Sequence, residues 1–368
     1  MNTNSKIYVA GHTGLVGSAI VKALKKSSYS NLVFSTRPEY DLRNQQAAEK
    51  FFSIHRPEYV FMSAAKVGGI AANNTYRADF IYDNLQIQNN LIQLSYKYGV
   101  KKLIFLGSSC IYPKESPQPI KEEYLLTGEL EYTNEPYAIA KIAGIKLCES
   151  YNLQYGTNFI AVMPTNLYGR NDNYDLEKSH VLPALIRKLH LAKCLSEGDY
   201  KAIREDARNR PIKGINTDSS DTEITELLKS FGIEKNKLTI WGTGRPRREF
   251  LHADDLGRAL VLLAEKINFE DLLKNDYGIS NPNYPITDRE VRNTHLNLGT
   301  GKDISILELA ELIQSIVGFE GKIESNPKMP DGTFRKLLDV SKAKSYGIEA
   351  QISLKEGLKR TYHEYLNH

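Results

Sequence analysis

The chain has 368 residues, enough for one large core or, as we expect, for two lobes. Hydrophobic residues make up 41% and charged residues 25%, which is ordinary for a folded globular protein and argues against disorder. The net charge of +4 is mild and comes without clustered basic runs, so we expect no nucleic-acid partner, whereas a small anionic ligand is compatible.

The first residues carry no signal for export or membrane insertion. The apolar run at 7–10 is too short for a signal peptide core or a membrane span. The three cysteines, Cys110, Cys148 and Cys194, are odd in number and widely spaced, which argues against a disulfide framework and a metal site. We therefore expect a cytoplasmic protein with no membrane partner and no bound metal.

A glycine-rich turn joins the first predicted strand, at 6–10, to a helical pattern at 18–26. Strand, glycine turn and helix in this order are typical of a dinucleotide-binding unit, in which the backbone approaches a pyrophosphate at the helix N-terminus. A plain strand-to-helix turn is the alternative. The predicted cofactor contacts in this turn are Gly11, Thr13, Gly14, Leu15, Val16 and Gly17.

The next predicted strand, 31–36, ends at Arg37, where an NAD site usually carries an acidic residue for the ribose hydroxyls. A cation at this position favours a 2′-phosphate and hence NADP(H), and an exposed surface arginine is the alternative. Asp41 and Leu42 follow closely, and we expect them on the adenine side of the cofactor.

Strands continue to alternate with helices, which predicts an α/β fold with a doubly wound parallel Rossmann sheet. Ligands of such sheets lie at the carboxyl ends of the strands. Ala64 and Ala65 lie at the end of one predicted strand, 58–64, and Ser108 and Cys110 follow another, 102–106.

Tyr137 and Lys141 lie four residues apart at the start of a helix predicted from 136 to 155. Residues at this spacing share a helix face, and a neighbouring cation would lower the pKa of the phenol. The pairs Tyr98/Lys102 and Tyr174/Lys178 have the same spacing, so spacing alone identifies no site. Tyr137 differs because its helix follows the strand that precedes Ser108.

Beyond residue 169 the alternation of predicted strands and helices becomes less regular. We predict a helix at 180–195, a polar inserted segment at 196–236 with a capping box at Ser220 and Glu223, and an irregular stretch at 268–294. The predicted Rossmann domain comprises 1–168, 237–266 and 294–300. A smaller, discontinuous substrate-binding lobe comprises 169–236, 267–293 and 301–368.

Taken together, these motifs resemble the extended short-chain dehydrogenase/reductases and, within them, the GDP-L-fucose synthase family. The resemblance covers nearly the whole chain except the two irregular insertions. The runs that carry it are Ala65–Tyr76, Leu106–Pro113, Thr133–Tyr151, Met163–Gly169 and Arg248–His252.

The resemblance implies an NADPH-dependent enzyme that epimerises and reduces a GDP-4-keto-6-deoxy sugar. Ser108 would hydrogen-bond the C4 carbonyl, Tyr137 would protonate the alkoxide, and Lys141 would hold the cofactor ribose. Cys110 and His180 match the cysteine and histidine that move protons at C3 and C5, and His180 would also border the cofactor. Without the family pattern, Cys110 is as well explained as a buried thiol and His180 as a residue at a helix start.

The resemblance also implies a site for the GDP moiety. Arg187 and Arg248 match positions that bind the diphosphate, and Asn166 and Trp241 would line the same pocket. Arg suits this role because its planar guanidinium binds phosphate through two hydrogen bonds. A structural ion pair between Arg248 and Asp254 or Asp255 is the alternative.

Three departures from the family pattern bear on specificity. Thr13 stands where the family often has a basic residue, so NADP preference depends mainly on Arg37. Met329 stands where a lysine is common, and the segment 196–236 has no counterpart in compact fucose synthases. These departures leave open a longer substrate, a GDP-4-keto-6-deoxy-heptose for surface polysaccharide synthesis, reduced with or without epimerisation.

Two further expectations concern partners. Members of the family usually pair through helices that correspond to 74–98 and 136–155, so a homodimer is expected. A cofactor-binding protein without catalytic activity is disfavoured, because every catalytic position is filled.

Overall fold

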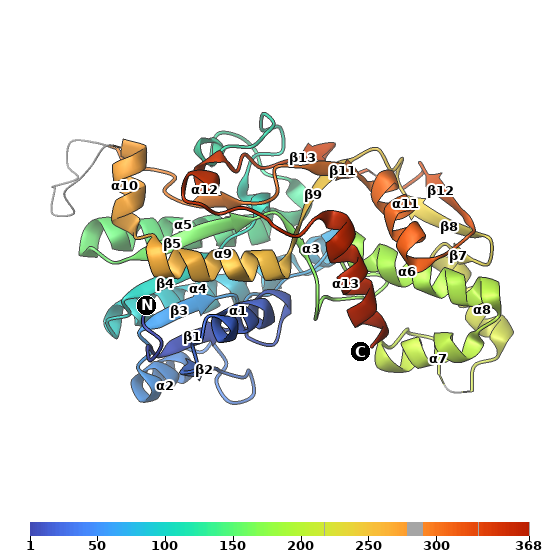
Figure 1. The fold of residues 1–368 in the computed structure, drawn as a ribbon, viewed down its shortest axis with the longest axis horizontal. Coiled ribbons are helices and arrows are strands. Elements are labelled where there is room, and N and C mark those ends of the chain that lie inside the picture. The colour runs from blue at the N-terminus through green and yellow to red at the C-terminus, as the bar shows by residue number, and fades with distance from the viewer. Residues whose placement is uncertain (217, 278–289, 330, 368) are drawn as a thin grey trace.

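The structure, a computed structural model, describes residues 1–216, 218–277, 290–329 and 331–367 (Figure 1). A six-stranded parallel sheet forms the larger lobe, in the order β10-β5-β4-β3-β1-β2. The predicted doubly wound sheet is confirmed. Its strands are β1 (Ile7–Ala10), β2 (Leu32–Val33), β3 (Tyr59–Met62), β4 (Lys102–Leu106), β5 (Phe159–Pro164) and β10 (Leu296–Leu298).

Helices cover both faces of this sheet, and the alternation along the strands explains why. In β1, Ile7 and Val9 enter one core cluster, whereas Tyr8 and Ala10 enter the other. Strands buried on both faces read as continuous apolar runs, as β1 and β4 do. The helices on one face are α1 (Leu15–Lys26) and α9 (Ala253–Lys266), and those on the other are α2 (Gln45–His55), α4 (Arg77–Lys97) and α5 (Glu135–Tyr155).

A second, smaller lobe lies beside the sheet (Figure 1). It has its own apolar core. Helices and a three-stranded sheet build it, with β8 in the centre of the sheet and the insertion described below adding to the core. The elements are α6 (Val181–Glu197), α11 (Ile306–Val317), α13 (Leu354–Leu366), β7 (Ile233–Glu234), β8 (Lys237–Trp241) and β12 (Lys322–Asn326).

The strand β9 (Arg247–His252) joins the two lobes. Phe250 packs into the core of the smaller lobe, and its neighbour Leu251 packs into a core of the larger one. β9 pairs with β6 (Asn166–Tyr168), β11 (Asp303–Ser305) and β13 (Arg335–Lys336). Residues that follow β5 and residues near the C-terminus are thereby held side by side.

The inserted segment folds as two helices, α7 (Tyr200–Asn209) and α8 (Asp221–Ser230), and α7 packs on α6. The predicted capping box of Ser220 and Glu223 is confirmed at the start of α8. Apolar residues of the insertion, among them Ile203 and Ile224, are fully buried in the core of the smaller lobe. The insertion is therefore part of that core.

Several predicted boundaries are wrong. Strand β8, assigned to the Rossmann domain, pairs instead with β7 and β12 of the smaller lobe, because an alternating pattern predicts a strand without specifying its sheet. Phe269–Tyr277 forms α10 inside the predicted irregular stretch and packs into the larger lobe; the part of that stretch at 278–289 lies outside the described residues. The helix predicted at 74–98 is split at Tyr76 into α3 (Ile70–Thr75) and α4.

Short elements complete the described chain. They are the 3₁₀ turns η1 (Ser109–Ile111), η2 (Glu122–Tyr124) and η3 (Tyr132–Asn134), and the helix α12 (Ser341–Ser345). None of the helices in the described ranges has the length and apolar character needed to cross a membrane.

Candidate active site

A cleft of about 1110 Å³ opens at the carboxyl ends of the parallel strands. Loops that follow β1, β2, β3, β4 and β5 line it, together with the residues just before α6. The sheet order reverses between β1 and β3, and this is where doubly wound sheets bind their ligands. The predicted site residues that line the cleft are Gly11, Thr13, Gly14, Leu15, Val16, Gly17, Arg37, Asp41, Leu42, Ala64, Ala65, Ser108, Tyr137, Lys141, Asn166 and His180.

The glycine turn fits a dinucleotide because its backbone is packed too closely for side chains. A Cβ on Gly17 would lie 2.0 Å from the Gly11 carbonyl oxygen. Gly11 itself has a φ of +80°, and a Cβ there would lie 2.8 Å from the Ala64 backbone nitrogen. No side chain caps the N-terminus of α1, and its first turn has no acidic residue, so its N–H groups suit an anion.

Tyr137 and Lys141 lie on α5 beside the Ser108 turn. Lys141 is 3% exposed, its Nζ donates to the Leu106 carbonyl oxygen at 2.8 Å, and it lies 5.7 Å from the centre of the Tyr137 ring. Ser108 is the N-cap of η1, and its Oγ accepts a long hydrogen bond from the Cys110 backbone nitrogen at 3.4 Å. The structure thus brings Ser108, Tyr137 and Lys141 together at the cleft.

The other two Tyr/Lys pairs do not meet at the cleft, since Lys178 is the one of their four residues that lines it. Lys102 lies in β4, and its Nζ donates to the carbonyls of Ala264 and Ile267 at 3.0 Å, at the end of α9. Tyr174 packs against Tyr365, with ring centres 4.8 Å apart. Equal spacing along the chain therefore produces a shared helix face only at Tyr137.

The predicted lowering of the Tyr137 pKa is wrong. Burial, followed by the neighbouring Cys110, raises the pKa of Tyr137. Burial also lowers the pKa of Lys141 to about 8. Tyr137 therefore keeps its proton at neutral pH, which suits a proton donor, and Lys141 keeps most of its charge.

Cys110 is buried in η1, behind the Ser108 turn, and does not line the cleft, whereas His180 does. Burial raises the pKa of the Cys110 thiol, and the Lys336 ammonium is the largest influence in the opposite direction. The surrounding protein lowers the pKa of His180, which leaves the imidazole neutral at neutral pH, although its side chain stays exposed to the cleft. His180 is the N-cap of α6.

The glycine loop after β3 positions His180. The Gly69 backbone nitrogen donates to the Lys178 carbonyl at 3.0 Å, and a Cβ on Gly69 would lie 2.9 Å from the Ser179 carbonyl. Only a glycine permits this contact between the loop and the residues before α6. The sequence identified the loop as part of a long matching run without indicating this role.

Arg187 does not line the cleft, and its placement contradicts the predicted diphosphate contact. It is 1% exposed, and its Nε and Nη2 bind the Asp206 carboxylate at 2.9 and 2.8 Å. Its Nη1 donates to the Tyr174 carbonyl at 3.0 Å, and its Nη2 also donates to the Arg210 carbonyl. The phase of α6 turns this side chain into the insertion, so its hydrogen-bonding capacity is used internally.

Lys188, the next residue on α6, lies near the Trp241 ring. Its Nζ donates to the Phe231 carbonyl at 3.0 Å and lies 6.0 Å from the centre of the Trp241 ring. Burial lowers its pKa to about 8, so it is cationic at neutral pH. Trp241 is 60% exposed at the end of β8, outside the cleft itself. Neither Lys188 nor Trp241 lines the cleft.

Arg248 lies half-buried on β9, next to a second lysine that sequence reasoning missed. Lys336 on β13 is paired in register with Arg248, and its charge acts on both Cys110 and Arg248. The alternative pairing of Arg248 with Asp254 or Asp255 is wrong, because these carboxylates bind Lys22 and Arg258. The adjacent basic residues Arg335 and Lys336 indicate a cation in this part of the chain. They do not indicate which of the two lies near the site.

No group of three or more His, Cys, Asp or Glu side chains suited to a metal ion occurs in the part of the chain that the structure describes. The three cysteines are free and buried.

A glycine turn at the switch point of a doubly wound sheet, facing a Ser, Tyr and Lys set, defines a dinucleotide-dependent enzyme of the short-chain dehydrogenase/reductase class. The chain belongs to the NAD dependent epimerase/dehydratase family, whose model matches residues 7–205 and 214–276. Within that class it belongs, more narrowly, with the GDP-L-fucose synthases. It is 48% identical over 363 residues to GDP-L-fucose synthase 1 of Arabidopsis thaliana, with 99% of this chain and 94% of the relative covered.

Solved structures agree with this assignment. The chain resembles a GDP-6-OMe-4-keto-L-xylo-heptose reductase from C. jejuni with a TM-score of 0.90, at 48% identity over 100% of this chain and 99% of the other. It also resembles a GDP-mannoheptose C4 reductase from Campylobacter jejuni with NADP bound, with a TM-score of 0.84, at 47% identity over 99% of each chain. The predicted family and enzyme class are confirmed.

Proposed function

We propose that this enzyme epimerises a GDP-4-keto-6-deoxy sugar at C3 and C5 and then reduces its C4 ketone, with GDP-L-fucose as the product. Its cofactor is NADP(H). The observation that carries the proposal is the gathering of Ser108, Cys110, Tyr137 and Lys141 beside a cleft that His180 enters from the other lobe.

The reduction needs a hydrogen-bonded carbonyl and a proton donor. The bound cofactor supplies the hydride. The Ser108 hydroxyl donates a hydrogen bond to the ketone oxygen, and the Tyr137 phenol, protonated at neutral pH, transfers its proton to the developing alkoxide. The Lys141 ammonium, held by the Leu106 carbonyl, stabilises the phenolate that remains.

The epimerisation needs one group that accepts a proton and another that donates one, on opposite faces of the sugar. Protons beside the C4 ketone are acidified by the carbonyl. His180 is neutral and can accept a proton, whereas Cys110 holds its thiol proton and can donate it. The Lys336 charge stabilises the thiolate that results.

The GDP moiety is proposed to bind along the smaller lobe. Arg248 and Lys188 supply cations for the diphosphate, and Trp241 offers an exposed ring for the base. Asn166 is held at the edge of the cleft by a hydrogen bond from its Nδ2 to the Glu249 carbonyl at 2.9 Å.

The test is a reaction in D₂O with NADPH and GDP-4-keto-6-deoxy-mannose, followed by NMR of the product. We expect cofactor oxidation and deuterium at C3 and C5. Cys110→Ser should bind NADPH normally and lose the deuterium; His180→Asn should also lose the deuterium, and its NADPH affinity is measured separately because His180 borders the cofactor site. No oxidation of NADPH by the wild-type enzyme with this substrate would refute the proposal.

A second candidate is the reduction of a GDP-4-keto-6-deoxy-heptose, with or without epimerisation, for surface polysaccharide synthesis. It is favoured by the similarity to two heptose reductases and by Met329, which replaces a lysine common in fucose synthases. A higher kcat/KM on the heptose than on the hexose would select this candidate. A product that carries no deuterium at C3 and C5 after reaction in D₂O would show that epimerisation is absent.

We also propose that the enzyme is a homodimer. The two long helices α4 and α5 pack on each other and leave large side chains exposed, including Tyr82 at 61% and Ile139 at 41%. Such a surface suits a second copy. Light scattering should give twice the chain mass of 41.6 kDa, and a mass of one chain would contradict the proposal.

The reaction is assigned to the cytoplasm as part of this proposal. Three free, buried cysteines suit a reducing compartment. Detection of the protein in a cytosolic fraction, separated from membranes and exported proteins, is the direct measurement.

A further inference from the structure

At one end of the cleft, the Asp41 carboxylate would oppose binding of the 2′-phosphate of NADP unless a cation pairs with it. Arg37 is the predicted cation for the 2′-phosphate, and Thr13 stands where a second cation is common. The Arg37 side chain is 73% exposed, and its Nε lies 3.9 Å from an Asp41 carboxylate oxygen. A free Asp41 would compete with the phosphate for Arg37 and would repel the phosphate directly.

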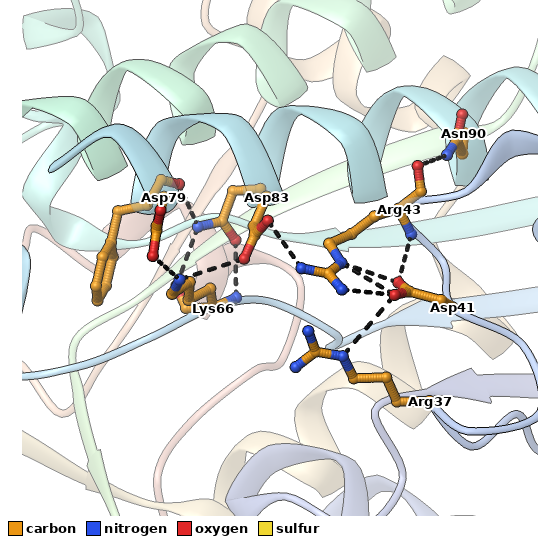
Figure 2. Close-up of polar contacts among 9 residues, drawn as sticks. Arg37, Asp41, Arg43, Lys66, Asp79, Asp83 and Asn90 are labelled. Atoms are coloured by element: carbon orange, nitrogen blue, oxygen red, sulfur yellow. Dashed lines mark hydrogen bonds and ion pairs between the residues drawn. The ribbon is translucent and has the colours of Figure 1, made fainter. Parts of the chain in front are cut away.

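Arg43 engages this carboxylate from the other side, as Figure 2 shows. Its Nη2 lies 2.6 Å from Asp41 Oδ2, and its Nε lies 3.0 Å from Oδ1 and 3.2 Å from Oδ2. The Arg43 backbone nitrogen also donates to Oδ1 at 3.0 Å. Asp41 therefore has most of its hydrogen-bonding capacity taken up by Arg43, whereas Arg37 has only a distant contact.

The helix α4 anchors Arg43 in this position. Its Nη1 lies 3.2 Å from Asp83, which also pairs with Lys66 at 3.3 Å. Asn90 donates to the Arg43 carbonyl at 3.1 Å (Figure 2). The guanidinium is thus held between Asp41 and Asp83, and the Arg43 backbone is held by Asn90.

We propose that Arg43 is a positioning residue for NADP specificity: it holds the Asp41 carboxylate and so leaves Arg37 available for the 2′-phosphate. The inference rests on the proposed use of NADP(H). Without Arg43, Asp41 is free to pair with Arg37 or to accept a hydrogen bond from a ribose hydroxyl, as acidic residues do in NAD sites. The hydrogen bonds from Arg43 also lower the pKa of Asp41, which keeps it ionised and paired at neutral pH.

The experiment measures dissociation constants of NADPH and NADH by isothermal titration calorimetry, without the sugar substrate. For Arg43→Gln we expect weaker NADPH binding, by about tenfold, and unchanged or tighter NADH binding, so that the preference for NADPH falls by tenfold or more. Arg43→Lys keeps the charge but loses the two-point contact, and it should fall between the wild type and Arg43→Gln.

A second substitution distinguishes a positioning role of Arg43 from a direct contact between Arg43 and the 2′-phosphate. Asp41→Asn added to Arg43→Gln removes the free carboxylate and should restore most of the NADPH affinity. A double variant that binds NADPH as weakly as Arg43→Gln would overturn the proposal, since Arg43 would then contact the phosphate itself.

A matched control is Arg204→Gln, which breaks an Arg–Asp pair of 2.7 Å with the same 32% side-chain exposure, far from the cleft in the insertion. It should leave the NADPH preference unchanged. Thermal unfolding of each variant confirms that it is folded before titration. If the wild type binds both cofactors equally, the proposed use of NADP(H) fails together with this inference; if the wild type prefers NADPH and Arg43→Gln keeps that preference, only this inference fails.

Discussion

Desolvation sets the protonation states of four residues in and beside the cleft. Tyr137, Lys141 and Cys110 are shielded from water by the surrounding protein, whereas His180 is exposed to the cleft; desolvation favours the neutral form of all four. At neutral pH the Tyr137 phenol and the Cys110 thiol therefore keep their protons, and the His180 imidazole is neutral. Lys141 keeps most of its charge. These are the protonation states that proton donation and proton abstraction at a keto sugar require.

Replacement of Tyr137 by phenylalanine should separate binding from chemistry. Tyr137→Phe removes the proton donor while the ring keeps its contact with Phe80, so we expect kcat to fall by about 10²- to 10⁴-fold with NADPH affinity and stability retained. Stopped-flow oxidation of NADPH gives kcat, and a titration gives the affinity. A variant with more than a tenth of wild-type kcat would remove Tyr137 from the mechanism.

The charge on Lys141 predicts a pH dependence. Its folded-state pKa of about 8 lies below the usual 10.5, so its charge is present below about pH 8 and is lost above it. We expect kcat/KM for NADPH to fall above about pH 8. Because the unfolded chain still binds this proton, Lys141 also makes the unfolding free energy rise with pH between these two pKa values.

The matched variant is Lys141→Arg, whose side chain stays charged throughout this pH range. Its activity should be lower overall, but the decline above pH 8 should be absent. A wild-type profile that stays flat to pH 9.5 would contradict the assignment of the decline to Lys141.

At the scale of elements, two glycine-dependent contacts assemble the site. Gly17 lets α1 pack against the Gly11 carbonyl, and Gly69 lets the loop after β3 pack against the residues before His180. Both contacts join segments that the sequence shows only as separate motifs. The cofactor turn and the His180 position therefore depend on close backbone packing and not on side-chain chemistry alone.

Gly17→Ala tests the first of these contacts. Its Cβ would lie 2.0 Å from the Gly11 carbonyl oxygen, so the turn must open, and we expect a loss of about 2 kcal/mol or more in unfolding free energy together with loss of cofactor binding. Urea unfolding and NADPH titration measure the two effects. The control is Gly14→Ala, whose Cβ would meet Gly11 O at an ordinary 3.6 Å, and whose stability should be close to the wild type.

At the scale of the whole molecule, a buried charge network joins the insertion to the C-terminal helix. Asp206 of α7 binds Arg187 of α6 and Arg210, and it accepts a hydrogen bond from the Tyr365 hydroxyl of α13. The insertion, α6 and the end of the chain are thus tied into one lobe. Changes there should alter stability before they alter chemistry.

Arg187→Met leaves the Asp206 charge without its main partner, and we expect a loss of about 3–5 kcal/mol in unfolding free energy. Asp206→Leu added to Arg187→Met should recover most of that loss. Arg248→Gln is the comparison, because it should raise KM for the GDP sugar with little change in stability. A normal unfolding curve for Arg187→Met with a raised KM would restore Arg187 to the diphosphate site.

The sequence by itself predicted the sheet, the glycine turn and the position of Ser108, Tyr137 and Lys141 at one cleft. These depend on local patterns: apolar strands before glycine turns, a helix that starts at Pro136, and a Ser108 loop directly after a strand. Parallel strands place their carboxyl ends at one edge, so chain order alone brings such residues to one cleft.

Only the tertiary structure decided the contacts between distant segments. Whether Arg187 or Lys188 faces Trp241 depends on the rotation of α6 against the insertion, and the place of β8 depends on β12, which lies more than eighty residues further along the chain. The clamp of Arg43 on Asp41 and the approach of Lys336 to Cys110 likewise depend on packing across elements. A periodic pattern defines an element and its buried face, but the partner of that face is chosen by the packing of the whole chain.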